Sequence, residues 1–349
     1  MTPDILNFTP EELKKKFTEM SFESFRADQA LGWIYEKGVY DFDRMTNLSV
    51  ELREKLKKDL SVGMPEVVES QRSNDDKSVK LLLKLSECDT VETVYIPKDD
   101  RQTVCVSSQV GCKFHCAFCA SGQNGFFRNL SSGEMVSQVL MARDLSPDKK
   151  LTNIVFMGIG EPFDNYKELL KAIRTLNSKR GLGIGARRIT ISTCGIVPKI
   201  ETLGDEGLQV ELSVSLHGPN DTVRGAIMPV NSAYPVKALI DACKKYTKKT
   251  KRVITFEYIL IKGVNASEHE ARELAKLLKG MLCKVNLIPY NPIKEFPHAA
   301  PTYEEIVRFQ QVLQVAGVKA TVRFSKGQDI QAACGQLRST KLDNAKAVS

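Results

Sequence analysis

The sequence contains no apolar run as long as a membrane span, and its N-terminus lacks the basic segment followed by an apolar segment that marks a secretory leader. No G-x-G-x-x-G motif follows the first predicted strand of the regular α/β part, which argues against a dinucleotide-binding fold. The nine cysteines are odd in number and are not typical of a disulfide scaffold in a chain of 349 residues. These absences lead us to expect a cytoplasmic protein in a reducing compartment, with no membrane association.

The remaining composition is that of an ordinary globular protein. Apolar residues make up 42% of the chain and charged residues 26%, and the length suits one α/β barrel with a smaller unit. The net charge of +8 is compatible with a polyanionic partner, because phosphates attract Lys and Arg. A Lys-rich surface without such a partner explains the charge equally well. No dimerisation stripe is evident, and we expect a monomer.

The pattern of apolar residues divides the chain into four parts. Residues 1–62 are predicted to form a small helical module, and residues 63–98 contain short segments typical of antiparallel strands, which we call the β extension. Residues 99–337 alternate strand-like and helix-like stretches, which indicates parallel βαβ units. Residues 338–349 are polar and are predicted to be a frayed tail.

Unusual segments follow most of the predicted strands of the third part. The strand-like runs are Thr103–Ser107, Asn153–Met157, Arg188–Ser192, Val210–Val214, Val253–Ile261, Val285–Ile288 and Ala320–Phe324. The segments that follow them are Cys112–Cys119, Gly158–Pro162, Ser192–Gly195, Ser215–His217, Pro289–Pro292 and Ser325–Cys334. In α/β barrels the active site is built from loops at the carboxyl ends of the strands. We therefore predict a barrel or partial barrel with one large site at that edge.

The first of these segments contains three cysteines, Cys112, Cys116 and Cys119, with C-x-x-x-C-x-x-C spacing. Structural zinc takes four protein ligands, and a 4Fe-4S cluster normally takes four thiolates. Three thiolates on such a cluster would leave one iron open to bind a substrate. The alternatives are buried thiols or a zinc site, for which His115 is poorly placed as the fourth ligand. The spacing favours the open cluster.

This spacing after a strand resembles the radical S-adenosylmethionine (SAM) enzymes, whose open iron binds SAM and whose cluster cleaves it to a 5′-deoxyadenosyl radical. In that family a Gly-Glu-Pro segment after the second strand holds the amino group of SAM, and Gly160, Glu161 and Pro162 match it. A carboxylate beside an ammonium group makes a charge-assisted hydrogen bond. The resemblance implies a partial (β/α)6 barrel, one 4Fe-4S cluster on three cysteines, and SAM on the open iron.

Longer segments are similar to those of the RlmN family, which methylates C2 of adenosine in 23S ribosomal RNA and, in some bacteria, in tRNA. The matching segments are Ala30–Gly38, Met45–Ser49, Thr103–Cys112, Gly125–Leu130, Arg187–Thr193, Ser215–His217, Asn286–Pro292 and Ala332–Leu337. The residues that the family places around SAM correspond to Gly160, Glu161, Ser192, Ser215, Leu216, His217 and Asn291. The resemblance also implies RNA as a partner and an electron donor such as flavodoxin.

The resemblance assigns chemistry to three residues outside the cysteine triplet. Adenine C2 is electron-poor and is no nucleophile, so a radical route is chemically sensible. In the family, a cysteine matching Cys334 first takes a methyl group from one SAM, and a radical from a second SAM removes a hydrogen from that methyl. The resulting carbon adds to C2 and forms a protein–RNA thioether. A residue matching Glu92 then takes the C2 proton, and a cysteine matching Cys105 releases the product in a transient disulfide with Cys334.

Simpler interpretations of single residues stay open. Glu92 alternates with apolar neighbours on a strand, which by itself predicts a solvated side chain. Glycines flank the segment around Cys334, which predicts a mobile loop. Ser192, His217 and Asn291 would by themselves be turn residues. Cysteine is commonly a small buried apolar residue, and we predict this for Cys88, Cys194, Cys243 and Cys283.

Two other functions stay open as well. A relative of the Cfr type would methylate C8 of the same adenosine. A non-catalytic iron-sulfur RNA-binding sensor would need the cluster but neither Cys105 nor Cys334. If RNA is the partner, several basic groups should line the barrel mouth or the helical module.

Overall fold

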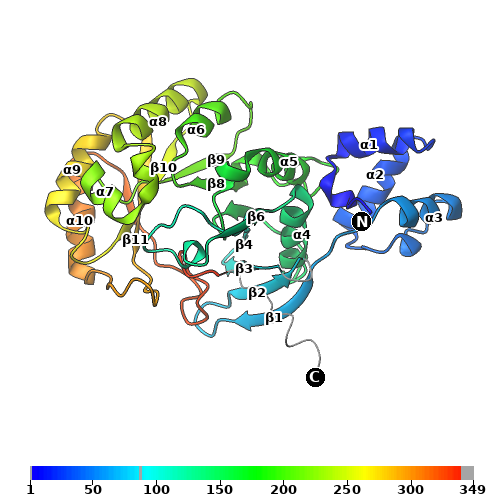
Figure 1. Cartoon of the computed structure of the whole chain (residues 1–349), viewed down its shortest axis with the longest axis horizontal. Helices are drawn as coiled ribbons and strands as arrows, with labels where there is room; N and C mark the ends of the chain where they lie inside the picture. The colour runs from blue at the N-terminus through cyan, green and yellow to red at the C-terminus, as the bar shows by residue number, and fades with distance from the viewer. Residues whose placement is uncertain (1, 86–88, 339–349) are drawn as a thin grey trace.

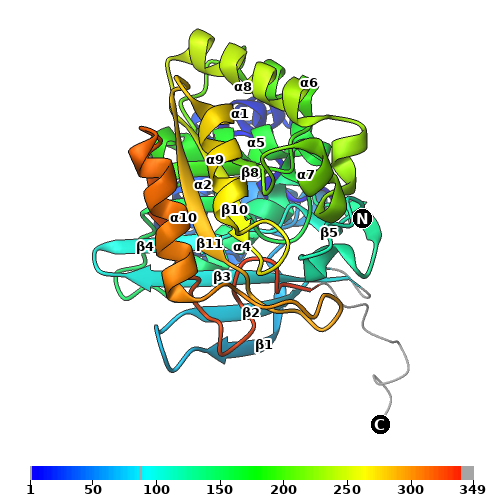
Figure 2. The ribbon, with the colours of Figure 1, turned by 90° about the vertical axis from the view of Figure 1, so that its left-hand side faces the viewer.

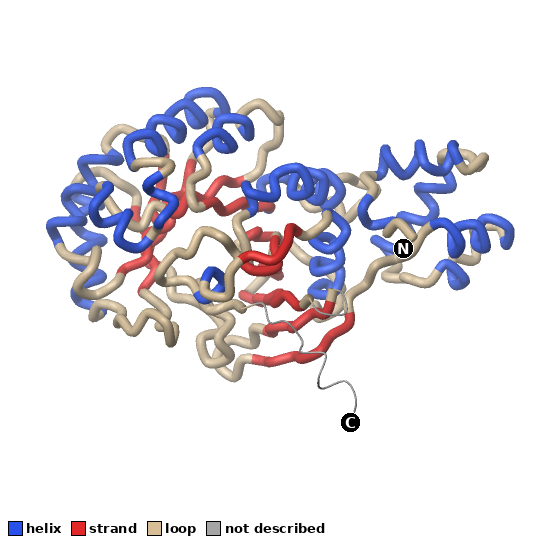
Figure 3. The backbone as a smooth tube through the Cα atoms, in the orientation of Figure 1, coloured by secondary structure: helices blue, strands red, loops and turns tan. Residues whose placement is uncertain are grey.

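A computed structural model of the chain describes residues 2–85 and 89–338, and it shows a small helical module beside a larger α/β body (Figure 1). The strands of the body, drawn in red in Figure 3, form a curved sheet with helices packed around it. Within these described residues no helix is both long and apolar enough to cross a bilayer.

The N-terminal module consists of short helices joined by tight turns. Its elements are η1 (Ile5–Asn7), α1 (Pro10–Glu19), α2 (Phe25–Leu31), the π-helical turn η2 (Gly32–Glu36), η3 (Phe42–Arg44) and α3 (Val50–Asp59). Helix α1 begins at a capping box, in which the Thr9 hydroxyl accepts a hydrogen bond from the Glu12 N–H and the Glu12 carboxylate accepts one from the Thr9 N–H. Leu13 and Phe17, one turn apart, are fully buried, so one face of α1 packs into the core.

Polar contacts at both ends of helix α4 (Ser132–Arg143) join the module to the α/β body. At its start, the Asn7 side chain accepts a hydrogen bond from the Gly133 N–H at 2.7 Å. At its end, the buried Arg143 donates to the Tyr35 carbonyl at 2.6 Å. These two attachments fix the position of the module, because they lie a whole helix length apart.

A ten-stranded sheet with the order β1-β2-β3-β4-β7-β8-β9-β10-β11-β12 forms the α/β body. Its strands are β1 (Glu66–Arg72), β2 (Val79–Lys84), β3 (Thr90–Lys98), β4 (Arg101–Cys105), β7 (Asn153–Phe156), β8 (Ile189–Thr193), β9 (Glu211–Ser215), β10 (Ile254–Leu260), β11 (Cys283–Pro289) and β12 (Ala320–Val322). Strands β1 to β4 pair antiparallel, and β4 and β7 to β12 pair parallel. Since β1 and β12 stand at opposite ends of this order, the described sheet is open. The prediction of an α/β fold with a partial barrel is confirmed, and the β extension continues the same sheet.

Helices follow the parallel strands and cover the outer face of the sheet (Figure 2). They are α4, α5 (Tyr166–Asn177), α6 (Val197–Leu203), α7 (Asp221–Ile227), α8 (Val236–Thr250), α9 (Glu268–Leu278) and α10 (Tyr303–Val315).

Successive side chains of strand β10 face opposite sides of the sheet. Tyr258 is fully buried and packs on Phe309 of α10, with ring centroids 5.3 Å apart, which stabilises the fold by about 1.5–3 kcal/mol per such ring. Glu257, the preceding residue, faces the opposite side of the sheet, where the polar residues gather.

Candidate active site

The three cysteines of the spaced triplet lie in the loop between β5 (Gln109–Gly111) and β6 (Phe126–Asn129), which pair as a separate two-stranded sheet. Gly111 has φ of +75°, and a Cβ there would lie 1.9 Å from the Gly125 carbonyl oxygen. The Cys112 N–H donates to that same carbonyl at 2.9 Å. Only glycine fits at position 111, so this close approach holds the start of the cysteine loop.

Two distant segments hold the rest of the cysteine loop. The Ala117 N–H donates to the Ile227 carbonyl, at the end of α7, at 2.9 Å. The Ala120 N–H donates to the carbonyl of Gly335, near the C-terminal end of the described chain, at 2.7 Å. The cysteine loop is therefore fixed between α7 on one side and the loop after β12 on the other.

The thiols of the cysteine loop are close enough for their charges to interact. Burial raises the pKa of Cys112 to about 12 and the pKa of Cys116 well above its usual range, and charge on Cys119 adds to both shifts. Within the described residues, no three His, Cys, Asp or Glu side chains are arranged as a ready-made metal site. His115, the neighbour that a zinc site would need, has an exposed side chain. Because burial favours the protonated thiols and a metal binds the thiolate form, metal binding by this loop must release protons.

Glu161, after β7, places a buried carboxylate beside the cysteine loop. A Cβ at Gly160, where φ is +99°, would lie 2.5 Å from the Cβ of Gln109, so this turn requires glycine. The Glu161 carboxylate accepts hydrogen bonds from the Phe163 N–H at 2.9 Å and from the Cys194 N–H at 2.7 Å. Burial raises the pKa of Glu161, and the groups that oppose this shift are neutral hydrogen-bond donors. Such a carboxylate is a suitable partner for an ammonium group.

His217, after β9, is a neutral side chain beside the same loop. Its backbone has φ of +56°, and its Nδ1 accepts a hydrogen bond from the Ile259 N–H at 3.0 Å. The ring stands edge-on to Phe118 of the cysteine loop, with centroids 4.8 Å apart. Burial, helped by the charge of Arg224, lowers the pKa of His217 to about 3, so the imidazole is uncharged at neutral pH.

The other residues expected around SAM on β8 and β9 differ in their surroundings. Ser192 and Ser215 are half-buried, on the side of the sheet opposite to the buried Ile191 and Val214. Leu216 is fully buried in the main hydrophobic core, so its side chain points away and only its backbone can take part in a site at this edge.

Asn291, after β11, is joined to the loop that carries Cys334. Its Nδ2 donates to the Ser325 hydroxyl at 2.8 Å and to the Cys334 carbonyl at 3.1 Å. Its Oδ1 accepts a hydrogen bond from the Gln328 side chain at 2.8 Å. We call residues 325–338 the C-terminal loop; Asn291 fixes the position of its backbone at Cys334.

The C-terminal loop brings Cys334 to the two other groups of thiols. Charge on Cys334 adds to the burial that raises the pKa of Cys105, and charge on Cys119 adds to the burial that raises the pKa of Cys334. Ala332 and Leu337 pack in one apolar cluster with Cys105. Cys334 is exposed to solvent. Every cysteine in the described part of the chain is a free thiol.

Hydrogen bonds anchor the C-terminal loop on both sides of Cys334. Before it, the Gly327 N–H donates to the Asp76 carboxylate at 2.8 Å. After it, the Ser121 hydroxyl donates to the Leu337 carbonyl at 2.7 Å. The loop thus lies between the β extension and the cysteine loop, as Figure 1 shows where its red trace passes next to β2 and β3. Mobility of this loop stays a prediction.

Glu92 is not a solvated residue, as its alternation on the strand had indicated. Its side chain is 9% exposed, and its carboxylate lies 3.0 Å from the Lys80 ammonium. It also accepts a hydrogen bond from the Arg338 N–H at 2.7 Å. Burial raises the pKa of Glu92, and the Arg338 N–H and Lys80 oppose that shift. The prediction was wrong because the C-terminal loop covers this face of β3.

The remaining cysteines were expected to be buried. Cys194 and Cys243 are buried, which confirms the prediction for those two. Cys283 is only partly buried, because it opens strand β11 at its amino end, away from the sheet centre. The prediction was therefore wrong for Cys283, and Cys88 lies outside the described residues.

Two family models match this chain: the ribosomal RNA large subunit methyltransferase N-terminal domain over residues 3–62, and the radical SAM superfamily over residues 106–276. The chain is 49% identical over 335 residues to a probable dual-specificity RNA methyltransferase RlmN of Thermoanaerobacter sp. (strain X514), with 96% of this chain and 97% of the relative covered. The chain belongs to the RlmN family. A relative of the same name from Clostridium novyi (strain NT) is 44% identical over 341 residues, with 98% and 99% covered.

A solved structure agrees with this family. The crystal structure of a radical SAM methyltransferase from Sphaerobacter thermophilus superposes with a TM-score of 0.93 and 45% identity, covering 96% of this chain and 99% of that chain. This RlmN-family chain is therefore an enzyme, a radical SAM methyltransferase, and the predicted radical SAM fold is confirmed. Membership of the superfamily implies a 4Fe-4S cluster and SAM as cofactors. Three neighbouring free thiols on one anchored loop fit the donor set of such a cluster.

The sequence patterns did not single out two buried charged residues of this RlmN-family site. Arg224 of α7 is fully buried and donates to the Cys194 carbonyl at 2.6 Å. Glu257 of β10 accepts hydrogen bonds from Ser213 and Asn286, both at 3.0 Å, and its second carboxylate oxygen is buried without a partner. The only available signal was a charge within an otherwise apolar strand at Glu257, and nothing marked Arg224.

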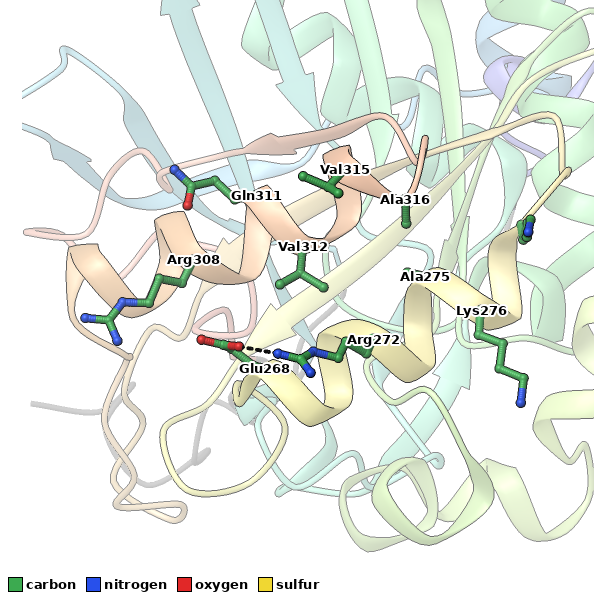
Figure 4. Close-up of a pocket in the computed structure, with 10 residues that line it drawn as sticks. Glu268, Arg272, Ala275, Lys276, Arg308, Gln311, Val312, Val315 and Ala316 are labelled. Carbon is green, nitrogen blue, oxygen red and sulfur yellow. Dashed lines mark hydrogen bonds and ion pairs between the residues drawn. The ribbon is translucent and has the colours of Figure 1, made fainter.

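A separate hollow of about 640 Å³ lies between α9 and α10, on the outside of the barrel (Figure 4). Its cationic side chains are Arg272, Lys276, Lys279 and Arg308. Arg272 is paired with Glu268 at 2.7 Å. The lining contains no thiol and none of the residues expected around SAM, so this hollow is not part of the RlmN-family site.

Proposed function

We propose that this RlmN-family enzyme methylates C2 of adenosine in 23S ribosomal RNA and in tRNA, through a methylated Cys334. The observation that carries the proposal is the placement of Cys334. Its loop packs on Cys105 through Ala332 and Leu337, and the next residue, Gly335, accepts a hydrogen bond from the Ala120 N–H beside Cys119. An iron-sulfur sensor that binds RNA without methylating it would need neither the Cys334 thiol next to the cysteine loop nor the buried Cys105. The name of the relatives, dual-specificity RNA methyltransferase, supports RNA as the substrate, and the matching motifs support position C2.

In this proposal the cofactor site is built from the loops at the strand ends. Cys112, Cys116 and Cys119 would hold the cluster, and the residues around SAM would be Gly160, Glu161, Ser192, Ser215, Leu216, His217 and Asn291. When bound, the cluster and SAM supply a 5′-deoxyadenosyl radical. The buried carboxylate of Glu161 would bind the ammonium group of SAM. Neutral His217 adds no positive charge to a site that would hold the cationic SAM.

Two thiols and one carboxylate would then act on the substrate. The Cys334 sulfur would accept the methyl group as the methyl–sulfonium bond of SAM breaks, and its proton would leave to the solvent that reaches this residue. The radical would take one hydrogen atom from this methyl group, and the resulting carbon would bond to C2 of the base. The adduct would then lose one electron to the oxidised cluster, and Glu92 would take the C2 proton. Burial makes Glu92 a stronger base, and Lys80 stabilises its ionised form. Cys105 would lose its proton and attack the Cys334 sulfur, so that an S–S bond forms and the C–S bond breaks. The electron pair of the C–S bond would stay on the carbon, which would take a proton to complete the methyl group of the released base.

The test is anaerobic turnover with ribosomal RNA or tRNA, SAM and a reductant, followed by mass spectrometry of the digested RNA. Formation of 2-methyladenosine supports the proposal, and 8-methyladenosine would assign the Cfr-type activity instead. The decisive variant is Cys334→Ala, with Cys243→Ala as the control, because Cys243 is a buried thiol on α8 outside the site. Full methylation by the Cys334→Ala protein would exclude the methyl-cysteine route, and RNA binding without methylation by the unmodified protein would favour a sensor.

Several expectations accompany this function. The partners would be RNA and a one-electron donor such as flavodoxin, and the protein would act as a monomer in the cytoplasm, where a reducing environment protects the thiols. RNA binding should weaken as salt rises from low to physiological concentration, because phosphate contacts release counterions.

A further inference from the structure

Arg224 carries a buried positive charge, and no residue in the described part of the chain forms an ion pair with it. Its side chain has 0% of its surface exposed, and its Nη1 donates to Asn231 Oδ1 at 2.9 Å and to the Tyr234 carbonyl at 3.3 Å. Its Nη2 donates to the Cys194 carbonyl, and Nε has no partner among the described residues. All of these partners are neutral. A buried guanidinium is costly unless a negative charge compensates it.

The two nearby carboxylates do not supply that charge directly. Asp221 accepts hydrogen bonds from the Asn231 side chain at 3.0 Å and from the Val236 N–H at 2.7 Å, so the Asn231 amide separates it from Arg224. Glu161 accepts from the N–H of Cys194, whereas Arg224 donates to the carbonyl of that residue. The peptide units of Cys194 thus lie between the two buried charges.

The surrounding backbone is shaped to admit this side chain. A Cβ at Gly218 would lie 2.6 Å from the Arg224 backbone nitrogen, and a Cβ at Gly195, where φ is +106°, would lie 3.2 Å from Nη2. Gly195 follows β8 and Gly218 follows β9. The ends of two neighbouring strands therefore close around Arg224, and both need glycine to do so.

The cysteine loop is the neighbour whose charge changes when a cofactor binds. The Ala117 N–H joins this loop to α7, the helix that carries Arg224. Cys116 and Cys119 pack against the same apolar cluster as Cys194, whose carbonyl accepts a hydrogen bond from Arg224. The cysteines of this loop bind a metal as thiolates, so cluster binding brings negative charge next to α7.

We infer that Arg224 is a positioning residue for the iron-sulfur cluster. In the chain without the cluster, no described residue compensates the charge of its buried guanidinium. In the loaded chain, the thiolates of Cys112, Cys116 and Cys119 compensate it. This inference rests on the cluster ligands of the proposed function. Its consequence is that Arg224 makes the free chain less stable and the loaded chain more stable. A nearby cation also favours the reduced, more negative cluster, so Arg224 raises its reduction potential.

The experiment compares the full chain before and after anaerobic reconstitution with iron and sulfide. The variants are Arg224→Met, which removes the charge, and Arg224→Lys, which keeps it. The matched control is Arg143→Met, because Arg143 is also buried with an unpartnered Nε and donates to a backbone carbonyl, at α4 and away from the cysteine loop. The readouts are iron per chain, the melting temperature of both forms, and the midpoint potential of the cluster from a redox titration followed by electron paramagnetic resonance.

We expect the unmodified chain to melt at a higher temperature after reconstitution. Arg224→Met should lose a large part of this gain, bind less iron and shift the midpoint potential to a more negative value, whereas Arg224→Lys should keep the potential. Arg143→Met should lower both melting temperatures equally and leave the potential unchanged. If Arg224→Met lowers both melting temperatures equally with no shift in potential, Arg224 is only a structural clamp and the inference is overturned.

Two further outcomes are informative. If Arg224→Met does not fold, Arg224→Gln decides, because it keeps hydrogen-bond donors and removes the charge: a midpoint potential shifted to a more negative value supports the inference, and an unchanged potential overturns it. If the unmodified chain takes up no iron, the cluster ligands of the proposed function are wrong, which is distinct from a failure at Arg224.

Discussion

Lys80 provides a test of how the structure controls Glu92. Its ammonium lies 3.0 Å from the Glu92 carboxylate, and the two side chains are only 10% and 11% exposed. At an effective dielectric constant of 20, this separation corresponds to an attraction of roughly 5 kcal/mol. Removing one member of such a buried pair costs about 3–5 kcal/mol. We therefore expect Lys80→Met to lower the free energy of unfolding at pH 7 by about 3 kcal/mol, the low end of that range, since some solvent reaches the pair.

The loss should depend on pH in a defined direction. Burial raises the pKa of folded Glu92 above 4.5, so its contribution to stability is fully present below about pH 4.5 and is lost as the pH rises through the folded pKa. Removing Lys80 raises that pKa further, because the nearby positive charge that favours the ionised carboxylate is lost. The difference between the two proteins should thus be small at pH 4 and large at pH 7. The acid limb of methylation should move to higher pH for the same reason, because Glu92 must be ionised to take a proton.

The assay is urea unfolding at pH 4 and pH 7, together with the pH profile of methylation. Lys84→Met is the control, because Lys84 lies on the same strand at 3.8 Å from the exposed Glu66; it should change stability by no more than about 0.5 kcal/mol. A loss for Lys80→Met that is equal at both pH values would refute the reasoning, since it would show that packing of the Lys80 stem, and not charge, stabilises this part of the sheet.

Three other predictions concern the site itself. Cys105→Ala should trap a covalent protein–RNA adduct, seen as a retarded band on a denaturing gel, and normal release of methylated RNA would contradict the role of Cys105. Glu161→Gln should weaken SAM binding at least tenfold in equilibrium dialysis while iron content stays constant, because a charge-assisted hydrogen bond contributes about 1.5–3 kcal/mol; unchanged affinity would move the ammonium site elsewhere. Gly111→Ala should lower both melting temperature and iron content, because its Cβ would meet the Gly125 carbonyl at 1.9 Å, and a variant as stable as the parent would show that the cysteine loop tolerates a wider approach.

The elements of the fold were largely predictable because each depends on local pattern. The predicted strand Val253–Ile261 corresponds to β10 at Ile254–Leu260, where β-branched and aromatic residues form a continuous run. Unusual segments after the parallel strands correctly indicated a common edge, because parallel strands place their carboxyl ends on the same side. The openness of the sheet was not evident from these patterns, since it depends on which strands become neighbours.

Glu92 shows where local reasoning fails. Alternation along β3 says which residues share a face, but not whether something covers that face. The contact that covers Glu92 is a hydrogen bond from the N–H of Arg338, which is 246 positions away in the chain. No pattern within a single strand carries information about a loop at that distance.

The sequence by itself determined the helices and strands, the family, and the three cysteines that suit a cluster, because periodicity and ligand spacing are properties of neighbouring residues. Only the tertiary structure decided that the loop carrying Cys334 packs on Cys105 and on the cysteine loop and that Glu92 is buried against Lys80. It also decided that Arg224 is enclosed next to the cysteine loop, with no ion pair to any described residue. These features depend on burial, and burial is decided by which distant segments pack together.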